Sequence, residues 1–261
     1  MPETTPTLAV PVVCSTKGQS TVARPWWGWA GCLGLSVTLA ACAPLQPGQS
    51  GHAVGDMQLA LPWGDWQDLG PSAQSWPLLP DLGATLPLQT RTLALRHDNT
   101  WQAVVWLQTT HHRSPPALDP TLWTDPCPTQ PDVWVQDDAA GSPVRIDCLR
   151  FKRAANRSEH WMAQNHPALQ QWLQTVQPGL PQPYAHISYR YATAGGAYVQ
   201  VTALVDERLL LPNRGNNADY LRSGELGRAW AKQLRMAVRQ AVARVDQRLV
   251  FPAFPLALPA R

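Results

Sequence analysis

The polar side chains best suited to catalysis lie around two adjacent histidines, His111 and His112. Both follow an apolar, strand-like segment and precede a loop rich in carboxylates. The nearby acidic residues are Asp119, Asp125, Asp137 and Asp138. Imidazole and carboxylate groups together can bind a metal ion or activate water, which keeps a hydrolase open as one alternative. Adjacent residues on a strand point to opposite faces, so we interpret the pair as solvated loop residues. We therefore predict no catalytic residue, no metal site and no cofactor.

Two further polar groups fall on predicted strands. His186, Ser188 and Arg190 alternate with apolar residues and so share one strand face, which could line a cleft and make the chain a small-ligand carrier. The solvated side of a half-covered sheet gives the same pattern, and we favour that interpretation. The triplet Asp206-Glu207-Arg208 follows the next strand, and we interpret it as a solvated strand end rather than an acid pair.

A row of cations recurs along the last long helical segment. Arg228, Lys232, Arg235 and Arg239 are three or four residues apart, which places them on one side of a helix. Four such cations could bind anionic lipid headgroups or an acidic protein. A helix face that is merely solvated gives the same pattern, and we favour that interpretation.

The N-terminal segment carries the most specific motif. Lys17 and Arg24 precede residues 26–41, a run without charge that is short for a membrane-spanning helix and typical of a secretory signal. The run ends in Leu39-Ala40-Ala41-Cys42, which resembles the lipobox of bacterial lipoproteins. The resemblance implies that residues 1–41 are removed and that Cys42 is lipidated. Ala43 after the cysteine implies the periplasmic face of the outer membrane.

The remaining cysteines follow from this resemblance. Cys14 and Cys32 leave with the signal peptide and Cys42 carries the lipid, so Cys127 and Cys148 remain. An even pair in an oxidising compartment predicts a disulfide, with two free buried thiols as the alternative.

Composition limits the class of protein. Hydrophobic residues make up 44% and charged residues 15% of the 261, with a net charge of +3. These values exclude a charged disordered chain and do not indicate nucleic-acid binding. Residues 42–55 are small and rich in proline and glycine, so we predict a lipidated N-terminus with a flexible tether, followed by one globular domain over 56–261.

The hydrophobic pattern of that domain predicts an α+β fold with a mostly antiparallel sheet built from two hairpins. One hairpin joins 92–96 to 100–108, and the second turns at Gly195-Gly196, a pair that predicts a two-residue turn. Residues 156–176 predict a helix split at Pro167, and residues 223–247 predict a long amphipathic C-terminal helix.

The order of these elements over residues 57–247, opening with Leu61-Pro62-Trp63 and Trp66, resembles that of PsbP-like domains. The resemblance implies a non-catalytic accessory or binding module. We therefore expect an envelope lipoprotein attached to the membrane by its lipid, with an envelope protein or a glycan as its partner. The oligomeric state stays open.

Overall fold

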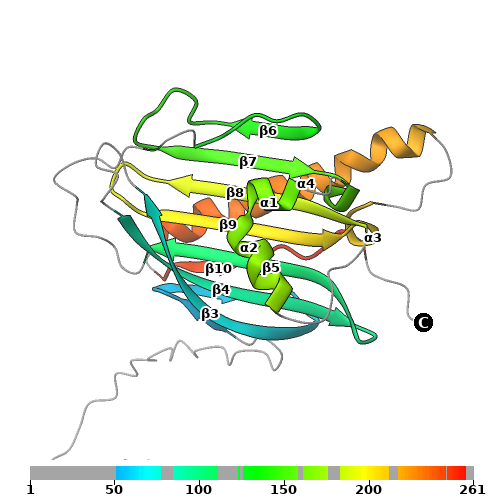
Figure 1. The fold of residues 1–261 in the computed structure, drawn as a ribbon, viewed down its shortest axis with the longest axis horizontal. Coiled ribbons are helices and arrows are strands. Elements are labelled where there is room, and N and C mark those ends of the chain that lie inside the picture. Colours follow the sequence, from blue (N-terminus) through cyan, green and yellow to red (C-terminus); the bar gives the residue numbers. More distant parts are fainter. Residues whose placement is uncertain are drawn as a thin grey trace, which may run out of the picture. The chain divides into compact units, whose positions relative to one another are not determined.

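The computed structural model describes residues 51–77, 85–110, 123, 126–157, 161–175, 183–211, 217–244 and 246–256. These residues form two β-sheets, and further elements cover both faces of the larger sheet (Figure 1).

The larger sheet is antiparallel, with its strands in the order β3-β4-β5-β9-β8-β7-β6. The strands are β3 (Asp65–Pro77), β4 (Thr85–His97), β5 (Thr100–Thr110), β6 (Val133–Asp137), β7 (Ile146–Lys152), β8 (Tyr184–Ala192) and β9 (Tyr198–Asp206). β5 and β9 pair at the centre, from Ala103 opposite Val205 to Thr109 opposite Val199. Nearly every residue of these two strands is buried, so both faces of the sheet must be covered.

A three-stranded sheet and the helix α4 (Asn217–Ala243) cover one face (Figure 1). The strands of this sheet, in spatial order, are β1 (His52–Val54), β2 (Met57–Ala60) and β10 (Arg248–Val250). Trp230, Leu234 and Val238 of α4 are fully buried in the core between these layers. In the described ranges, no helix combines the length and apolar composition that a membrane span requires.

Short helices cover the opposite face. The elements are η1 (Ala155–Arg157), α1 (Trp161–Asn165) and α2 (Pro167–Thr175), while α3 (Glu207–Leu210) follows β9 directly. Trp161 and Leu169 pack with Trp106 and Leu204 of the sheet. Pro167 begins α2, where the missing N–H of proline leaves no hydrogen bond unmade.

The α+β class predicted from the sequence is confirmed. The helix predicted over residues 223–247 lies instead at Asn217–Ala243, and three other details differ. The predicted tether ended at residue 55, whereas His52 already pairs with Leu59 in a hairpin that turns at Gly55 (φ +58°). The predicted two-residue turn at Gly195-Gly196 is wrong, because the strands end at Ala192 and Tyr198 and leave a five-residue loop, residues 193–197.

The third difference is β3, which no prediction placed. Its prolines and glycines argued against a strand, but β3 is an edge strand, where a missing N–H can be tolerated. Its register to β4 shifts between Asp68 and Pro71, and this irregularity accommodates Gly70 (φ +98°).

Candidate groove between α4 and β10

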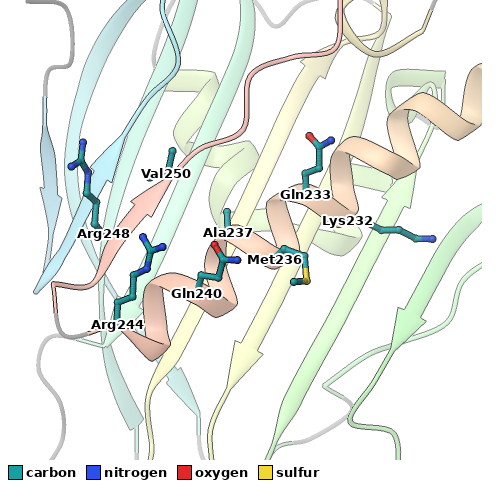
Figure 2. A pocket seen from close by; sticks show the side chains of 8 residues that line it. All are labelled: Lys232, Gln233, Met236, Ala237, Gln240, Arg244, Arg248 and Val250. Carbon is teal, nitrogen blue, oxygen red and sulfur yellow. The ribbon is translucent and has the colours of Figure 1, made fainter. Parts of the chain in front are cut away.

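A groove of about 420 Å³ runs along the outer side of α4, beside β10 (Figure 2). Its lining consists of Lys232, Gln233, Met236, Ala237, Gln240, Arg244, Arg248 and Val250. Lys232, Met236 and Arg244 are separated by multiples of four residues, so the helix brings them to one side. Arg248 and Val250 come from β10, which lies next to α4 because it pairs with β2.

Cations stand at both ends of the groove. Lys232 lies at one end, and Arg244 and Arg248 lie at the other (Figure 2). Twelve residues of helix separate Lys232 from Arg244, a distance of about 18 Å at 1.5 Å per residue. One carboxylate lies close by, since Asp246 accepts a hydrogen bond from the backbone N–H of Arg248 (3.3 Å).

The middle of the groove is apolar. Met236 is 52% exposed and Val250 is 51% exposed, which makes them two of the most exposed large hydrophobic side chains of the described residues. Ala237 lies between them in the lining. Exposed apolar side chains between separated cations can bind an anion that also has an apolar portion.

The predicted basic surface is only partly present. Lys232 lines the groove, Arg228 is half-buried, and the side chain of Arg239 is 42% exposed with Nη1 3.5 Å from Oδ2 of Asp147. The inclusion of Arg235 is wrong, because this residue is 7% exposed and faces the sheet. It follows Ala231 by four residues and precedes Val238 by three, so it belongs to the buried side of the helix.

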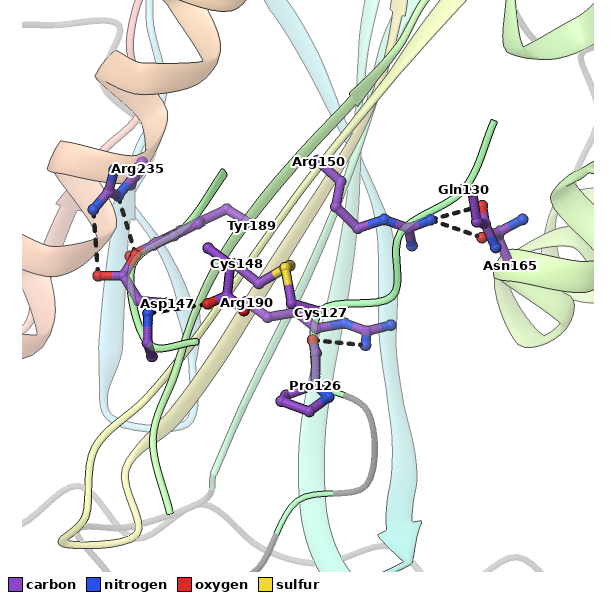
Figure 3. Close-up of a disulfide and its surroundings, with 12 residues drawn as sticks. Pro126, Cys127, Gln130, Asp147, Cys148, Arg150, Asn165, Tyr189, Arg190 and Arg235 are labelled. Atoms are coloured by element: carbon purple, nitrogen blue, oxygen red, sulfur yellow. Dashed lines mark hydrogen bonds and ion pairs between the residues drawn. A yellow bond between two sulfur atoms is a disulfide. The ribbon is translucent and has the colours of Figure 1, made fainter. Parts of the chain in front are cut away.

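Arg235 is held by two carboxylates at the β6–β7 edge of the large sheet, one of which, Asp147, is labelled in Figure 3. Its Nε lies 3.1 Å from Oδ1 of Asp147, a residue that is 2% exposed, and its Nη2 bonds to Asp138. The same Oδ1 of Asp147 accepts a hydrogen bond from the hydroxyl of Tyr189 (3.0 Å). This network therefore connects α4 to β7, β8 and the loop after β6.

Two pKa values reflect this network. The hydrogen bond from Arg235 holds the pKa of Asp138 below its usual value, and a bond from Gln136 acts in the same direction. Burial raises the pKa of Tyr189, and the negative charge of Asp147 raises it further. Asp138 therefore stays ionised and Tyr189 stays a hydrogen-bond donor at neutral pH, which makes the network structural.

The disulfide lies on the opposite face of β7 from Asp147. Cys127 and Cys148 have their sulfur atoms 2.06 Å apart, and Cys148 is fully buried (Figure 3). The bond fixes the loop before β6 onto the sheet, where Trp123 stacks on Tyr198 with ring centroids 5.3 Å apart.

The polar strand face is packed, so the interpretation as the solvated side of a sheet is wrong and the alternative of an open cleft for a small ligand is not found there either. His186 and Ser188 are each 1% exposed. The ring of His186 lies 4.5 Å from that of Trp161 and 4.8 Å from that of His166, between centroids. Burial lowers the pKa of His166 to about 3 and lowers that of His186 well below its ordinary value, so both rings are neutral at pH 7.

Two arginines cross the same face. The Nη2 of Arg150 donates to Gln130 at 2.7 Å and to Asn165 at 3.2 Å, and Arg190 reaches the carbonyl of Pro126 at 3.5 Å (Figure 3). These bonds connect the sheet to the loop before β6 and to α1. Arg190 therefore contacts the loop that carries Cys127 instead of lining an open cleft.

The other predicted sites divide in two. Residues 1–50, with Cys42, and residues 111–122, with His111, His112 and Asp119, lie outside the described residues, as does Asp125. The part of the chain that is described holds no group of three or more His, Cys, Asp or Glu residues that could bind a metal ion.

Asp206, Glu207 and Arg208 organise the start of α3. Oδ1 of Asp206 accepts a bond from the N–H of Arg208 (2.9 Å), and its carboxylate also pairs with the guanidinium at 2.6 Å. Glu207 accepts from the N–H of Ala154 at 2.5 Å. The prediction of a solvated strand end is wrong, because Asp206 is 1% and Glu207 is 4% exposed. Asp206 caps α3, and Glu207 binds the chain just before η1.

Of the eight residues that line the groove, the sequence prediction included only Lys232. The four-residue spacing from Lys232 extends to Arg244 and was available as a signal. Arg248 and Val250 gave no local signal, because their place beside α4 depends on pairing with a strand about 190 residues earlier.

Comparisons with protein-family models, with curated proteins and with solved structures give no match to this chain.

Proposed function

We propose that this chain is an envelope lipoprotein that acts as a non-catalytic binding or accessory module at the periplasmic face of the outer membrane. The motif Leu39-Ala40-Ala41-Cys42, directly after an uncharged run, supports lipidation at Cys42. The bond between Cys127 and Cys148 is compatible with an oxidising compartment.

We further infer that the groove between α4 and β10 binds the headgroup of an anionic phospholipid in that membrane. The single observation that carries this inference is the arrangement of Lys232, Arg244 and Arg248 around two exposed apolar side chains. Arg244 and Arg248, at one end, fit a phosphate, and the apolar wall fits the glycerol and acyl portion. Lys232, whose Nζ lies 5.7 Å from the ring centroid of Trp134, is too far along α4 to reach the same phosphate and would meet a neighbouring headgroup. In this proposal α4 is an amphipathic helix with one side in the core and the other at the membrane.

The length of the tether supports a lipid rather than a distant partner as occupant. His52 is opposite Leu59, which is in turn opposite Leu249 of β10. Strands are about 4.8 Å apart, so the tether enters the fold about 10 Å from the β10 wall of the groove. Residues 43–51 span at most about 30 Å when extended. A domain anchored at Cys42 therefore keeps this groove close to the bilayer.

The affinity expected from this contact is moderate. Each Lys or Arg near an anionic surface contributes about 1 kcal/mol, so three cations contribute about 3 kcal/mol. An anchor at Cys42 with diacylglyceryl and acyl groups carries several chains and already gives stable attachment. The role of the groove in this proposal is therefore to fix which side of the domain faces the membrane.

The test places an environment-sensitive fluorophore at the groove of the lipidated protein in vesicles. Met236→Cys provides the attachment site, and brominated lipids report contact with the bilayer. We expect quenching in vesicles that contain phosphatidylglycerol and much less in purely zwitterionic vesicles. High salt should reduce it, since exposed charges are screened.

Charge reversal separates the groove from general attraction. Lys232→Glu with Arg244→Glu should abolish the quenching, whereas Arg145→Glu, at an exposed position between β6 and β7, should leave it nearly unchanged. Equal quenching in both lipid mixtures, or no effect of the groove reversal, would contradict the proposal. Loss of signal on adding an acidic protein, without any lipid dependence, would favour a protein partner instead.

A further inference from the structure

A second cavity, of about 480 Å³, lies where the β4–β5 hairpin meets the C-terminal segment. We call it the bulge cavity. Leu95, Leu209 and Phe254 are among its apolar lining residues, and Gln102 and Trp63 also line it. Its volume lies within the range of small-molecule pockets, about 300–1,000 Å³.

A β-bulge places Gln102 at this cavity. Leu95 is opposite Ala103, but the next residue, Arg96, is opposite Trp101, so Gln102 is an extra residue without a partner in β4. Trp101 packs with the cluster under α1 and α2, and Ala103 packs in the core under α4. A bulge interrupts strict alternation and redirects a side chain, here that of Gln102.

The amide of Gln102 has an unmet hydrogen bond. The residue is 3% exposed, and its Nε2 donates to the hydroxyl of Thr100 at 2.7 Å. Its Oε1 is buried and has no hydrogen-bond partner among the described residues. A buried acceptor without a protein donor is destabilising unless water or a ligand donates to it, and a cavity of this size beside Gln102 can hold either.

Trp63 stands at the open side of the same cavity. It is among the lining residues and yet 96% of its surface is exposed. The segment under it is fixed, because the indole N–H of Trp66 donates to the carbonyl of Pro62 at 2.9 Å. A large aromatic ring that gains nothing from burial in its own fold is suited to contact with another molecule.

We propose that the bulge cavity binds a small, uncharged, apolar ring compound that carries one O–H or N–H donor. The donor bonds to Oε1 of Gln102, and the ring packs between Trp63, Leu95 and Phe254. A net charge on the ligand is disfavoured because the lining contains one acid, Asp65, and one base, Arg96, whose charges balance. This site is independent of the groove between α4 and β10.

The test compares two ring compounds that differ only in the donor. Indole has an N–H, and 1-methylindole has a methyl group in its place. Binding to the purified full-length protein is followed by the methyl NMR signals of Leu95 and Leu209, which report this cavity rather than binding elsewhere. We expect indole to bind about fivefold more tightly than 1-methylindole, the effect of one net hydrogen bond.

Two variants and a matched control complete the design. Gln102→Leu should remove the preference for indole while 1-methylindole still binds. Trp63→Ala, at a position so exposed that folding is unaffected, should weaken both compounds. Gln164→Leu removes an exposed amide on α1, away from both sites, and should change neither. Equal binding of the two compounds to the unmodified protein, no shift of either leucine, or an unchanged affinity in Trp63→Ala would each overturn the proposal.

Discussion

The ion pair between Arg235 and Asp147 gives the sharpest prediction for stability. Asp147→Ala removes the buried charge partner of Arg235 and the acceptor of the Tyr189 hydroxyl. Breaking a buried ion pair costs about 3–5 kcal/mol, because the remaining charge stays desolvated. Asp138 still bonds to Arg235 and offsets part of this loss. We therefore expect the free energy of unfolding to fall by about 3 kcal/mol, at the lower end of that range.

Urea unfolding followed by tryptophan fluorescence measures this change. Asp138→Ala is the matched control, since its side chain is 41% exposed and its loss should cost about 1 kcal/mol or less. Asp147→Leu combined with Arg235→Met removes both charges and should recover at least half of the loss. If Asp147→Ala is no more destabilising than Asp138→Ala, Arg235 is not a buried, paired charge. That result would refute the placement of Arg235 on the buried side of α4.

Two further predictions concern pH and helix packing. His166 titrates near pH 6.5 when unfolded and at about 3 when folded, so stability is complete above pH 6.5 and falls on acidification. Between pH 6.5 and 5 we expect the free energy of unfolding to fall by about 2 kcal/mol from His166 alone, and His186 adds a loss of the same sign. In a His166→Phe variant the urea midpoint should therefore change less with pH. A midpoint independent of pH over this range would contradict the burial of the pair. In α4, a Cβ at Gly227 would lie 2.7 Å from the ring of Phe151, whereas one at Gly224 would meet nothing closer than 3.9 Å. Thermal unfolding should show Gly227→Ala destabilised by about 1–3 kcal/mol and Gly224→Ala stabilised by up to about 1 kcal/mol; equal effects would contradict the close packing of α4 on β7.

Local patterns predicted the parts of the fold that depend on local physics. Val199, Val201 and Ala203 alternate along β9 and face one core, which the period of two in the sequence already indicated. Pro167 indicated the start of α2, because proline fits the first turn of a helix, where its missing N–H is not needed. The features that were not predicted depend on contacts between residues that are far apart in the sequence. No strand was predicted where β3 lies, because its prolines carry no signal that the strand lies at an edge.

The candidate sites show the same division. The spacing of cations indicated that α4 has a basic side, and the same spacing placed Arg235 on it. Nothing local showed that Arg235 pairs with Asp147, which lies 88 residues away in the sequence. The bulge at Gln102 could not be predicted, since it arises from the register between two strands and not from either strand alone. Trp63 gave no sign that it would stand in solvent instead of the core.

The mass of the intact chain, extracted from native membranes before and after reduction, tests the central claim most directly. An envelope lipoprotein should have a mass that starts at Cys42 and includes diacylglyceryl and acyl groups. Reduction should add about two daltons for one opened disulfide between Cys127 and Cys148. A mass that retains residues 1–41 without lipid would contradict the anchor, and the proposal that the groove between α4 and β10 meets a membrane would fall with it.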